Sequence, residues 1–375
     1  MMIKKTSTLL LILLCSTLIS KAQDPNFLIF LAFGQSNMEG AGTIESQDRT
    51  VDSRFKVFQS VDCSNLNRTK NEWYPAIPPS CRCWSGLSPV DYFGRTLVEN
   101  LPEHIKIGII NVSVGGCRIE LFDKDIYQNF TNTFTEDWFQ DIIKSYDGNP
   151  YQHLVDLAKK AQKDGVIKGI LLHQGESNNG DSQWPNKVKK IYDDLITDLS
   201  LNPEDIPLLA GELVHADQGG ALAGMNSIIA QLPATLPNSY VISSSECTDK
   251  DDNIHFNSAG YRDLGRRYGE KMMTLLEYNS ELILAEQLPL ESGLFQNHPN
   301  PAIVSTNIPF QLAKEGIVTL ELLDLSGKTI RGIASGHYPE GRHVVEFDVS
   351  EIPSGIYFYK LLTTQAIQIK KIIIQ

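Results

Sequence analysis

The chain of 375 residues is too long for one typical domain of about 100–200 residues, so two domains are expected. Its hydrophobic fraction of 42% and charged fraction of 21% are those of a globular protein and exclude a mainly disordered or collagen-like chain. The formal net charge of -12 leaves no basic footprint for a nucleic acid, so we exclude DNA and RNA as partners.

The N-terminus has the pattern of a secretory signal peptide over residues 1–22. Lys4 and Lys5 precede an apolar run, and Ser20 and Ala22 put small residues where signal peptidase cleaves. The apolar run is shorter than the about 20 residues of a spanning helix. We therefore expect cleavage after Ala22, export of the mature protein, and no membrane span once the signal peptide is removed.

Residues 23–280 alternate the patterns of buried strands and amphipathic helices. Short apolar runs predict strands over 27–33, 107–112, 169–173, 207–213 and 240–244. Helical periodicity falls between and after them, over 89–100, 151–163, 184–199, 221–231 and 258–276. This alternation indicates βαβ units, so we predict an α/β fold with a doubly wound, mainly parallel sheet.

Three other segments depart from this rhythm. Residues 45–88 and 118–148 are expected to be long loops, the first of them over the edge of the sheet. A linker is expected over 281–295. Beyond it, residues 296–375 contain β-branched and aromatic runs separated by turn residues, which predicts a small all-β sandwich.

Five cysteines remain after the signal peptide is removed, an odd number that leaves at least one unpaired within the chain. They are Cys63, Cys81, Cys83, Cys117 and Cys247. We expect Cys63 and Cys81 to form a disulfide because they flank a polar, proline-containing segment. No cysteine and histidine spacing is typical of a zinc site, so neither a metal nor a cofactor is expected.

A serine follows the first predicted strand, at the edge where parallel sheets place their active sites. Gly34 precedes Gln35 and Ser36 there, so Ser36 is a candidate nucleophile; the alternative is a serine that caps the next helix. Near the end of the same domain, His255 is a candidate general base. Asp252 lies three residues earlier and could orient the imidazole, with Asp249, Asp251 and Glu176 as rival orienters.

Acyl transfer also needs hydrogen-bond donors for a developing oxyanion. Gly115 and Gly116 follow the second strand and offer backbone N–H groups, unless they form only a tight turn. Gln174 follows the third strand and offers its side-chain amide, while Ser36 offers its own N–H. Polar residues after successive strands of one sheet therefore converge on one edge, which favours a hydrolase.

These residues carry a family resemblance over about 25–277. The blocks GQSNM at 34–38, VGG at 114–116, HQGESN at 173–178 and DNIH at 252–255 resemble the SGNH-type hydrolases, which have a flavodoxin-like three-layer fold. More narrowly, they resemble sialate O-acetylesterase-like proteins and carbohydrate esterase family 6 acetylxylan esterases. The resemblance implies Ser36 as nucleophile, His255 as base and Asp252 as its partner. It also implies an oxyanion hole of Ser36, Gly115 or Gly116, and Gln174; the supporting candidates are Glu176, Asn37 and Asn178.

The C-terminal region resembles the type A sorting domain of the type IX secretion system, which implies a bacterial protein exported through the periplasm. The motifs are NHPNP at 297–301, LSGK at 325–328, PSGIY at 353–357 and the final Lys370-Lys371. The alternative is a carbohydrate-binding sandwich in which Tyr338, Tyr357 and Tyr359 stack on sugars.

We therefore hypothesise a secreted serine esterase that removes acetyl groups from xylan or a related plant polysaccharide. An O-acetylated sialic acid is the alternative substrate, with Arg118 as a candidate partner for its carboxylate. A non-catalytic glycan-binding protein is the alternative from another class. Trp84, Trp138 and Trp184 are interpreted as packing residues in preference to sugar-stacking ones.

Overall fold

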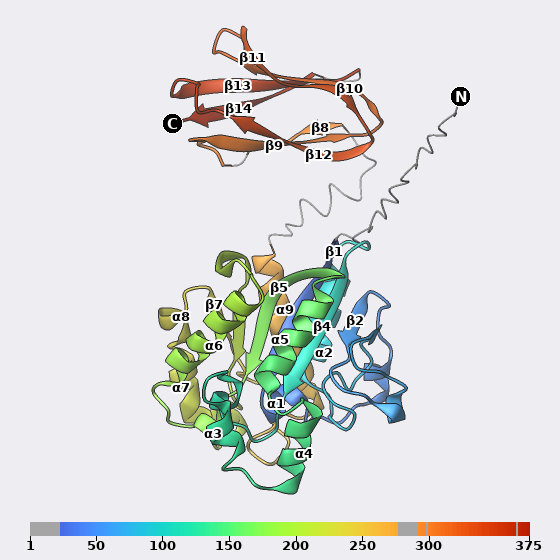
Figure 1. The fold of residues 1–375 in the computed structure, drawn as a ribbon, viewed down its shortest axis with the longest axis vertical. Helices are drawn as coiled ribbons and strands as arrows, with labels where there is room; N and C mark the ends of the chain where they lie inside the picture. The colour runs from blue at the N-terminus through green and yellow to red at the C-terminus, as the bar shows by residue number, and fades with distance from the viewer. Residues whose placement is uncertain (1–22, 277–291, 298, 365–366) are drawn as a thin grey trace, which may run out of the picture. The chain divides into compact units, whose positions relative to one another are not determined.

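A computed structural model describes residues 23–276, 292–297, 299–364 and 367–375, in two compact units that divide between 278 and 279 (Figure 1). The predicted signal peptide lies outside the described residues, as does most of the predicted linker. The domain limits 23–280, 281–295 and 296–375 therefore stay a prediction. Within the described ranges, no helix is long and apolar enough to cross a membrane.

The first unit is built on a seven-stranded sheet in the order β3-β2-β4-β1-β5-β6-β7. Every neighbouring pair is parallel except β2 and β3. The strands are β1 (Asp24–Gly34), β2 (Phe55–Phe58), β3 (Trp73–Pro75), β4 (Lys106–Ser113), β5 (Gly165–His173), β6 (Leu208–Gly211) and β7 (Ser239–Ile242). The predicted doubly wound, mainly parallel α/β fold is confirmed.

Helices cover both faces of this sheet, because side chains of β1 alternate between two apolar cores. Ile29 and its alternate neighbours pack with α5 (Pro150–Ala161) and α6 (Trp184–Asp198). Phe30 and the remaining side chains pack with α2 (Pro89–Asn100) and α9 (Ser258–Leu275). Both faces of the sheet are therefore buried under helices, which explains the unbroken apolar runs in the sequence.

Shorter helices lie in the connections between these elements. The α-helices are α1 (Ser36–Glu39), α3 (Tyr127–Thr131), α4 (Asp137–Ser145), α7 (Asn226–Ile229) and α8 (Leu232–Thr235). Single 3-10 turns span Ser46–Arg49, Ser64–Leu66, Ile119–Phe122, Glu176–Asn178, Pro203–Asp205, Ala216–Gln218 and Ala223–Met225. The helix predicted over 221–231 is thus a 3-10 turn followed by the single turn of α7.

The segment 45–88 corrects one expectation, because it extends the sheet instead of only passing over its edge. β2 pairs with β4 in parallel, and β3 closes that edge in antiparallel pairing with β2. Phe55 and Val57 of β2 are fully buried, which is the reason the sheet continues here.

The disulfide in the same segment joins Cys63 to Cys83, with their Cα atoms 5.2 Å apart. The expected pairing of Cys63 with Cys81 is therefore wrong. Cys81 instead points into the core, where its Sγ lies 3.3 Å from the Tyr146 hydroxyl and burial raises the pKa of the thiol to about 12. Cys117 and Cys247 are also buried free thiols.

The second unit is an all-β sandwich, as expected. One sheet has the order β11-β10-β13-β14 and the other β12-β9-β8, with antiparallel neighbours throughout. The strands are β8 (Gly293–Leu294), β9 (Ser305–Leu312), β10 (Gly316–Leu323), β11 (Thr329–Tyr338), β12 (Gly341–Asp348), β13 (Gly355–Leu362) and β14 (Ile367–Ile374). Both sheets contribute to one core, and Tyr359 is buried in it, so this tyrosine is not available to stack on a sugar.

Candidate active site

Ser36 is the first residue of α1 and directly follows the central strand β1. The turn between them needs a glycine at position 34. Gly34 has φ +153°, and a Cβ atom there would lie 2.1 Å from the carbonyl oxygen of His173. The Gln35 N–H donates to that same carbonyl at 3.1 Å. The chain therefore turns tightly against β5 and presents Ser36 at the carboxyl edge of the sheet.

His255 and Asp252 complete a continuous hydrogen-bonded path from Ser36. The Ser36 Oγ lies 2.8 Å from His255 Nε2, and His255 Nδ1 lies 2.8 Å from Asp252 Oδ2. Asp252 Oδ1 also accepts the N–H groups of Ile254 and His255 at 2.9 and 2.7 Å. Partial burial acts to raise the pKa of Asp252, but these hydrogen bonds outweigh it and hold the pKa below its usual value. Asp252 is therefore a carboxylate at neutral pH, as an imidazole partner must be.

The rival orienters of His255 have other contacts. Asp249 Oδ2 accepts the N–H of Asn253 at 3.1 Å and so supports the loop from within. Asp251 and Asn253 both have positive φ, 63° and 60°, which turns the chain on either side of Asp252. Among the described carboxylates, only Asp252 contacts the His255 ring.

The predicted oxyanion donors divide into two groups by their hydrogen bonds. The Ser36 and Gly116 N–H groups have no acceptor among the residues that the structure describes. The Gly115 N–H instead donates to Glu39 Oε2 at 2.6 Å. Gln174 Nε2 donates to Gln35 Oε1, the Cys117 carbonyl and Asn178 Oδ1, at 3.0, 3.3 and 2.8 Å. Ser36 and Gly116 are therefore the donors left free for an oxyanion.

Glu39 and Arg82 are two residues of the site that the sequence analysis missed. Arg82 donates to Glu39 Oε1, while Glu39 Oε2 accepts the Gly115 N–H. A Cβ atom on Gly115 would lie 3.2 Å from Glu39 Oε2 and 3.9 Å from Ser36 Cβ, so this ion pair adjoins the serine. The available signals were the position of Glu39 directly after the GQSNM block and that of Arg82 between two cysteines.

Asn37 contacts the backbone beside His255, and Glu176 contacts Asn37, but neither is hydrogen-bonded to the His255 ring. Asn37 Nδ2 donates to Glu176 Oε1 at 2.6 Å and to the Ile254 carbonyl at 3.0 Å. Asn37 Oδ1 accepts the hydroxyl of Tyr261 at 2.6 Å. Both Asn37 and Glu176 are buried. They fix α1 to the segment that carries His255.

Asn178 and His173 lie deeper in the same network. Asn178 Oδ1 accepts the Ile119 N–H at 2.8 Å, so it anchors the loop that follows the glycine pair. His173 donates from Nε2 to the Glu212 carbonyl at 2.9 Å. Burial lowers the pKa of His173, which is therefore neutral. These residues support the site without facing Ser36.

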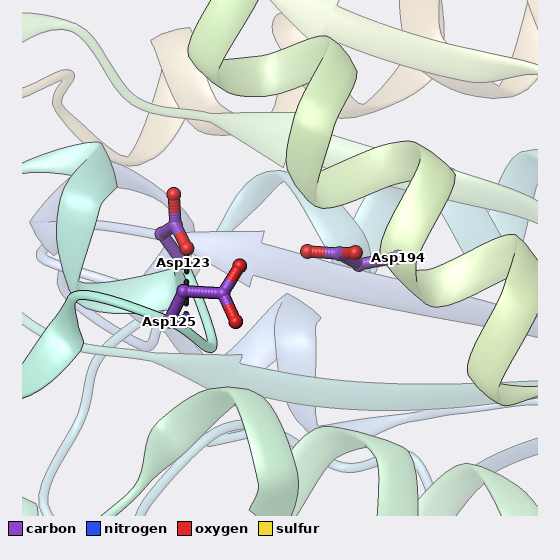
Figure 2. A group of neighbouring side chains, drawn as sticks. All are labelled: Asp123, Asp125 and Asp194. Carbon is purple, nitrogen blue, oxygen red and sulfur yellow. Dashed lines mark hydrogen bonds between the residues drawn. The ribbon is translucent and has the colours of Figure 1, made fainter.

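One cluster of carboxylates among the described residues has its oxygens close enough for a metal ion. Figure 2 shows Asp194, on α6, facing Asp123 and Asp125. The Lys190 Nζ lies 2.8, 2.7 and 2.9 Å from Asp123, Asp125 and Asp194 respectively. Burial acts to lower the pKa of Lys190, but the three carboxylates outweigh it and raise that pKa. Because Lys190 pairs with all three carboxylates and Lys124 pairs with Asp194 at 3.3 Å, the cluster is an ion-pair network.

The tryptophans do not share one environment. Trp184 is fully buried and donates its indole N–H to Gln174 Oε1, so the packing interpretation is confirmed for it. Trp138 is 51% exposed and Trp84 is 83% exposed. The packing interpretation is therefore wrong for Trp84, whereas the ring of Trp138 packs in part, against Phe134 and Phe139.

Two family models match the chain. Residues 26–274 match the family described as carbohydrate esterase, sialic acid-specific acetylesterase. Residues 297–375 match the secretion system C-terminal sorting domain, so the chain is a secreted or cell-surface protein.

Similar solved structures include two with TM-scores just above 0.5, which share the fold of the first unit. A protein from Arabidopsis thaliana is 19% identical with a TM-score of 0.51, over 67% of this chain and 99% of that one. NanS is 16% identical with a TM-score of 0.51, over 68% of this chain and 99% of that one. A carbohydrate acetylesterase from Xanthomonas citri is 14% identical with a TM-score of 0.47, over 92% and 79% of the two chains.

Proposed function

This chain belongs to the carbohydrate esterase family of sialic acid-specific acetylesterases, and we propose that it removes O-acetyl groups from xylan or a related plant polysaccharide through an acetyl-enzyme on Ser36. The observation that carries the proposal is the path of two 2.8 Å contacts from Ser36 through His255 to Asp252. Acyl transfer through a serine requires a general base next to the hydroxyl and a carboxylate that orients this base.

The reaction proceeds in two halves. His255 Nε2 takes the proton of Ser36 as Oγ bonds to the acetyl carbonyl carbon, and Asp252 stabilises the imidazolium that forms. The bond from that carbon to the sugar oxygen then breaks, and His255 gives its proton to the leaving alcohol. Water attacks the acetyl-enzyme with His255 again as base, which releases acetate and restores the serine hydroxyl.

The developing negative oxygen needs donors that are free before the reaction begins. We assign this role to the N–H groups of Ser36 and Gly116, because Gly115 and Gln174 donate to protein acceptors. Gln174 shapes the hole indirectly, since it fixes the Cys117 carbonyl that follows Gly116.

The net charge of -12 favours an uncharged polymer such as acetylated xylan over an anionic substrate. One observation favours the alternative, an O-acetylated sialic acid with a carboxylate. Arg118 follows the glycine pair, and its side chain is 49% exposed. Its nearest acid, Glu120, lies 3.9 Å away and is also paired with Lys187 at 2.8 Å. Arg118 therefore retains charge that a substrate carboxylate could use.

The test is acetate release from acetylated xylan and from O-acetylated sialic acid by the purified protein, beside Ser36→Ala. We expect the serine variant to lose about 10³-fold or more of the activity while remaining folded. Arg118→Ala separates the substrates, because it should weaken only sialate hydrolysis. Activity that survives in folded Ser36→Ala would overturn the assignment of the nucleophile.

We further propose that the type IX secretion machinery recognises residues 296–375, on the strength of the sorting-domain match. A chain that lacks this unit should keep its esterase activity and fail to leave the cell. Secretion at the level of the full chain would rule the sorting role out.

A further inference from the structure

An exposed indole lies beside the free oxyanion donor. Trp138 is the second residue of α4, and half of its surface is open to solvent. Its Cη2 atom lies 3.5 Å from the position that a Cβ atom on Gly116 would take. The preceding residue, Gly115, adjoins Ser36 in the same way, at 3.9 Å from its Cβ. Trp138 therefore lies close to Ser36, and α4, which carries it, lies at the same end of the sheet as α1 (Figure 1).

The ring is held in place from beneath. Phe134 and Phe139 make perpendicular contacts with the Trp138 ring, at centroid distances of 6.2 and 5.8 Å. Phe139 is fully buried and belongs to the core beneath α4. These edge contacts restrain the orientation of the indole, while its exposed half remains uncovered. A restrained ring costs little conformational entropy when a ligand packs on it.

Gly116 keeps this ring accessible from the side of Ser36. Its φ of +71° is in the left-handed region that favours glycine, and any side chain would be directed at the indole. The indole N–H also has no acceptor among the described residues, in contrast to that of Trp184. The exposed Trp138 thus combines an apolar face with a free donor, both next to the reacting centre.

We propose that Trp138 is a specificity-determining residue that stacks on the ring of the sugar bearing the acetyl group, or of its neighbour in the polymer. A sugar ring presents C–H groups on its face, which match an aromatic surface, and hydroxyls at its edge, which match the indole N–H. The sugar it suits is uncharged, because the two residues before Trp138, Glu136 and Asp137, are exposed acids that disfavour an anion. This inference rests on the proposed function and names how that same site selects its carbohydrate.

The experiment compares two esters with wild type, Trp138→Ala and Trp138→Phe. One ester is an acetylated xylo-oligosaccharide; the other is ethyl acetate, which has no ring to stack. We expect Trp138→Ala to raise KM for the oligosaccharide about three- to tenfold, with kcat little changed, and Trp138→Phe to recover part of the loss. Hydrolysis of ethyl acetate should stay within about twofold of wild type for both variants, since its ester makes no use of stacking.

Ile126→Ala is the matched control, because Ile126 is a 41% exposed apolar residue in the segment that leads to α4. It should leave both KM values unchanged. An unchanged oligosaccharide KM in folded Trp138→Ala would overturn the proposal, as would an equal loss on ethyl acetate, which would mean that Trp138 only supports the glycine turn. Failure of the proposed function is seen separately: wild type would then release no acetate from ethyl acetate, or Ser36→Ala would still release it. Cleavage of ethyl acetate without any cleavage of the oligosaccharide would refute the sugar assignment and the stacking role together.

Discussion

Arg82 is expected to neutralise the Glu39 carboxylate next to Ser36, so that this negative charge does not destabilise the oxyanion of the reaction. Its guanidinium donates to Glu39, whose other carboxylate oxygen accepts the Gly115 N–H. The side chains of Glu39 and Arg82 are only 12% and 20% exposed. Water therefore screens the ion pair weakly, and the charge of the Glu39 carboxylate is balanced mainly by Arg82.

The size of the effect follows from the distances around Gly115. The position of a Cβ atom there is 3.2 Å from Glu39 Oε2 and 3.9 Å from Ser36 Cβ, so the carboxylate lies within about 7 Å of the serine. At an effective dielectric constant of about 20, an unpaired charge at about 7 Å raises the energy of an oxyanion by about 2 kcal/mol. That energy corresponds to a loss of about 30-fold in kcat.

The assay is the rate of acetate release by Arg82→Met, which keeps an apolar stem, and by the double variant Arg82→Met with Glu39→Gln. The single variant should lose about 30-fold in kcat, and the double variant should recover most of that loss because no charge is left unpaired. Thermal unfolding establishes that both variants fold. A single variant within about twofold of wild type, or a double variant no faster than the single one, would refute the electrostatic reasoning.

Two further predictions concern carboxylates. Asp252→Asn should lower kcat about 10²–10⁴-fold because an amide cannot stabilise the His255 imidazolium. Glu176→Gln should lower kcat much less. Steady-state kinetics of the two variants would contradict this prediction if Glu176→Gln were the slower. Burial disfavours the charge of Asp91 more than hydrogen bonds from Ser88 favour it, which raises its pKa from 3.8 to about 6. The protonated Asp91 side chain therefore stabilises the folded state, and this stabilisation is complete below pH 3.8 and is lost as the pH rises through 6. The free energy of unfolding of wild type, measured relative to Asp91→Asn, should accordingly fall by about 3 kcal/mol between about pH 4 and pH 7. Urea denaturation at both pH values measures this, and a difference that does not change with pH would count against it.

The sequence was sufficient for the central strands and the long helices of the first unit, but not for α1 or for α3 and α4, which lie in a segment that was expected to be a loop. Strands buried on both faces are unbroken apolar runs, so their pattern is visible without any partner. β2 and β3 were missed because they have four and three residues, in a polar, proline-containing segment. β2 is stabilised by pairing with β4, which follows about fifty residues later, and β3 by pairing with β2, so neither strand leaves a local signal.

The residues of the site were predictable where a sequence motif contains them. They were not predictable where a contact joins residues that are far apart in the sequence. The roles expected for Ser36, His255 and Asp252 remain proposals, and the fold brings the three into one hydrogen-bonded path. The contact of Glu39 with Arg82 spans 43 residues, and its contact with Gly115 spans 76. Neither spacing has a periodicity that identifies a partner. The sequence alone therefore does not distinguish an N–H group that is free to bind an oxyanion from one that already donates to a protein acceptor.

The hydrogen-bonded path from Ser36 to Asp252 needs the first unit to be folded from position 36 to position 255. Ser36 and His255 are 219 positions apart, near opposite ends of that unit, and Asn37 joins their two segments by donating to the Ile254 carbonyl. A nascent or translocating chain holds the serine long before it holds a positioned base. A chain that ends before residue 255, or that has not yet folded, therefore lacks the base that the proposed reaction needs.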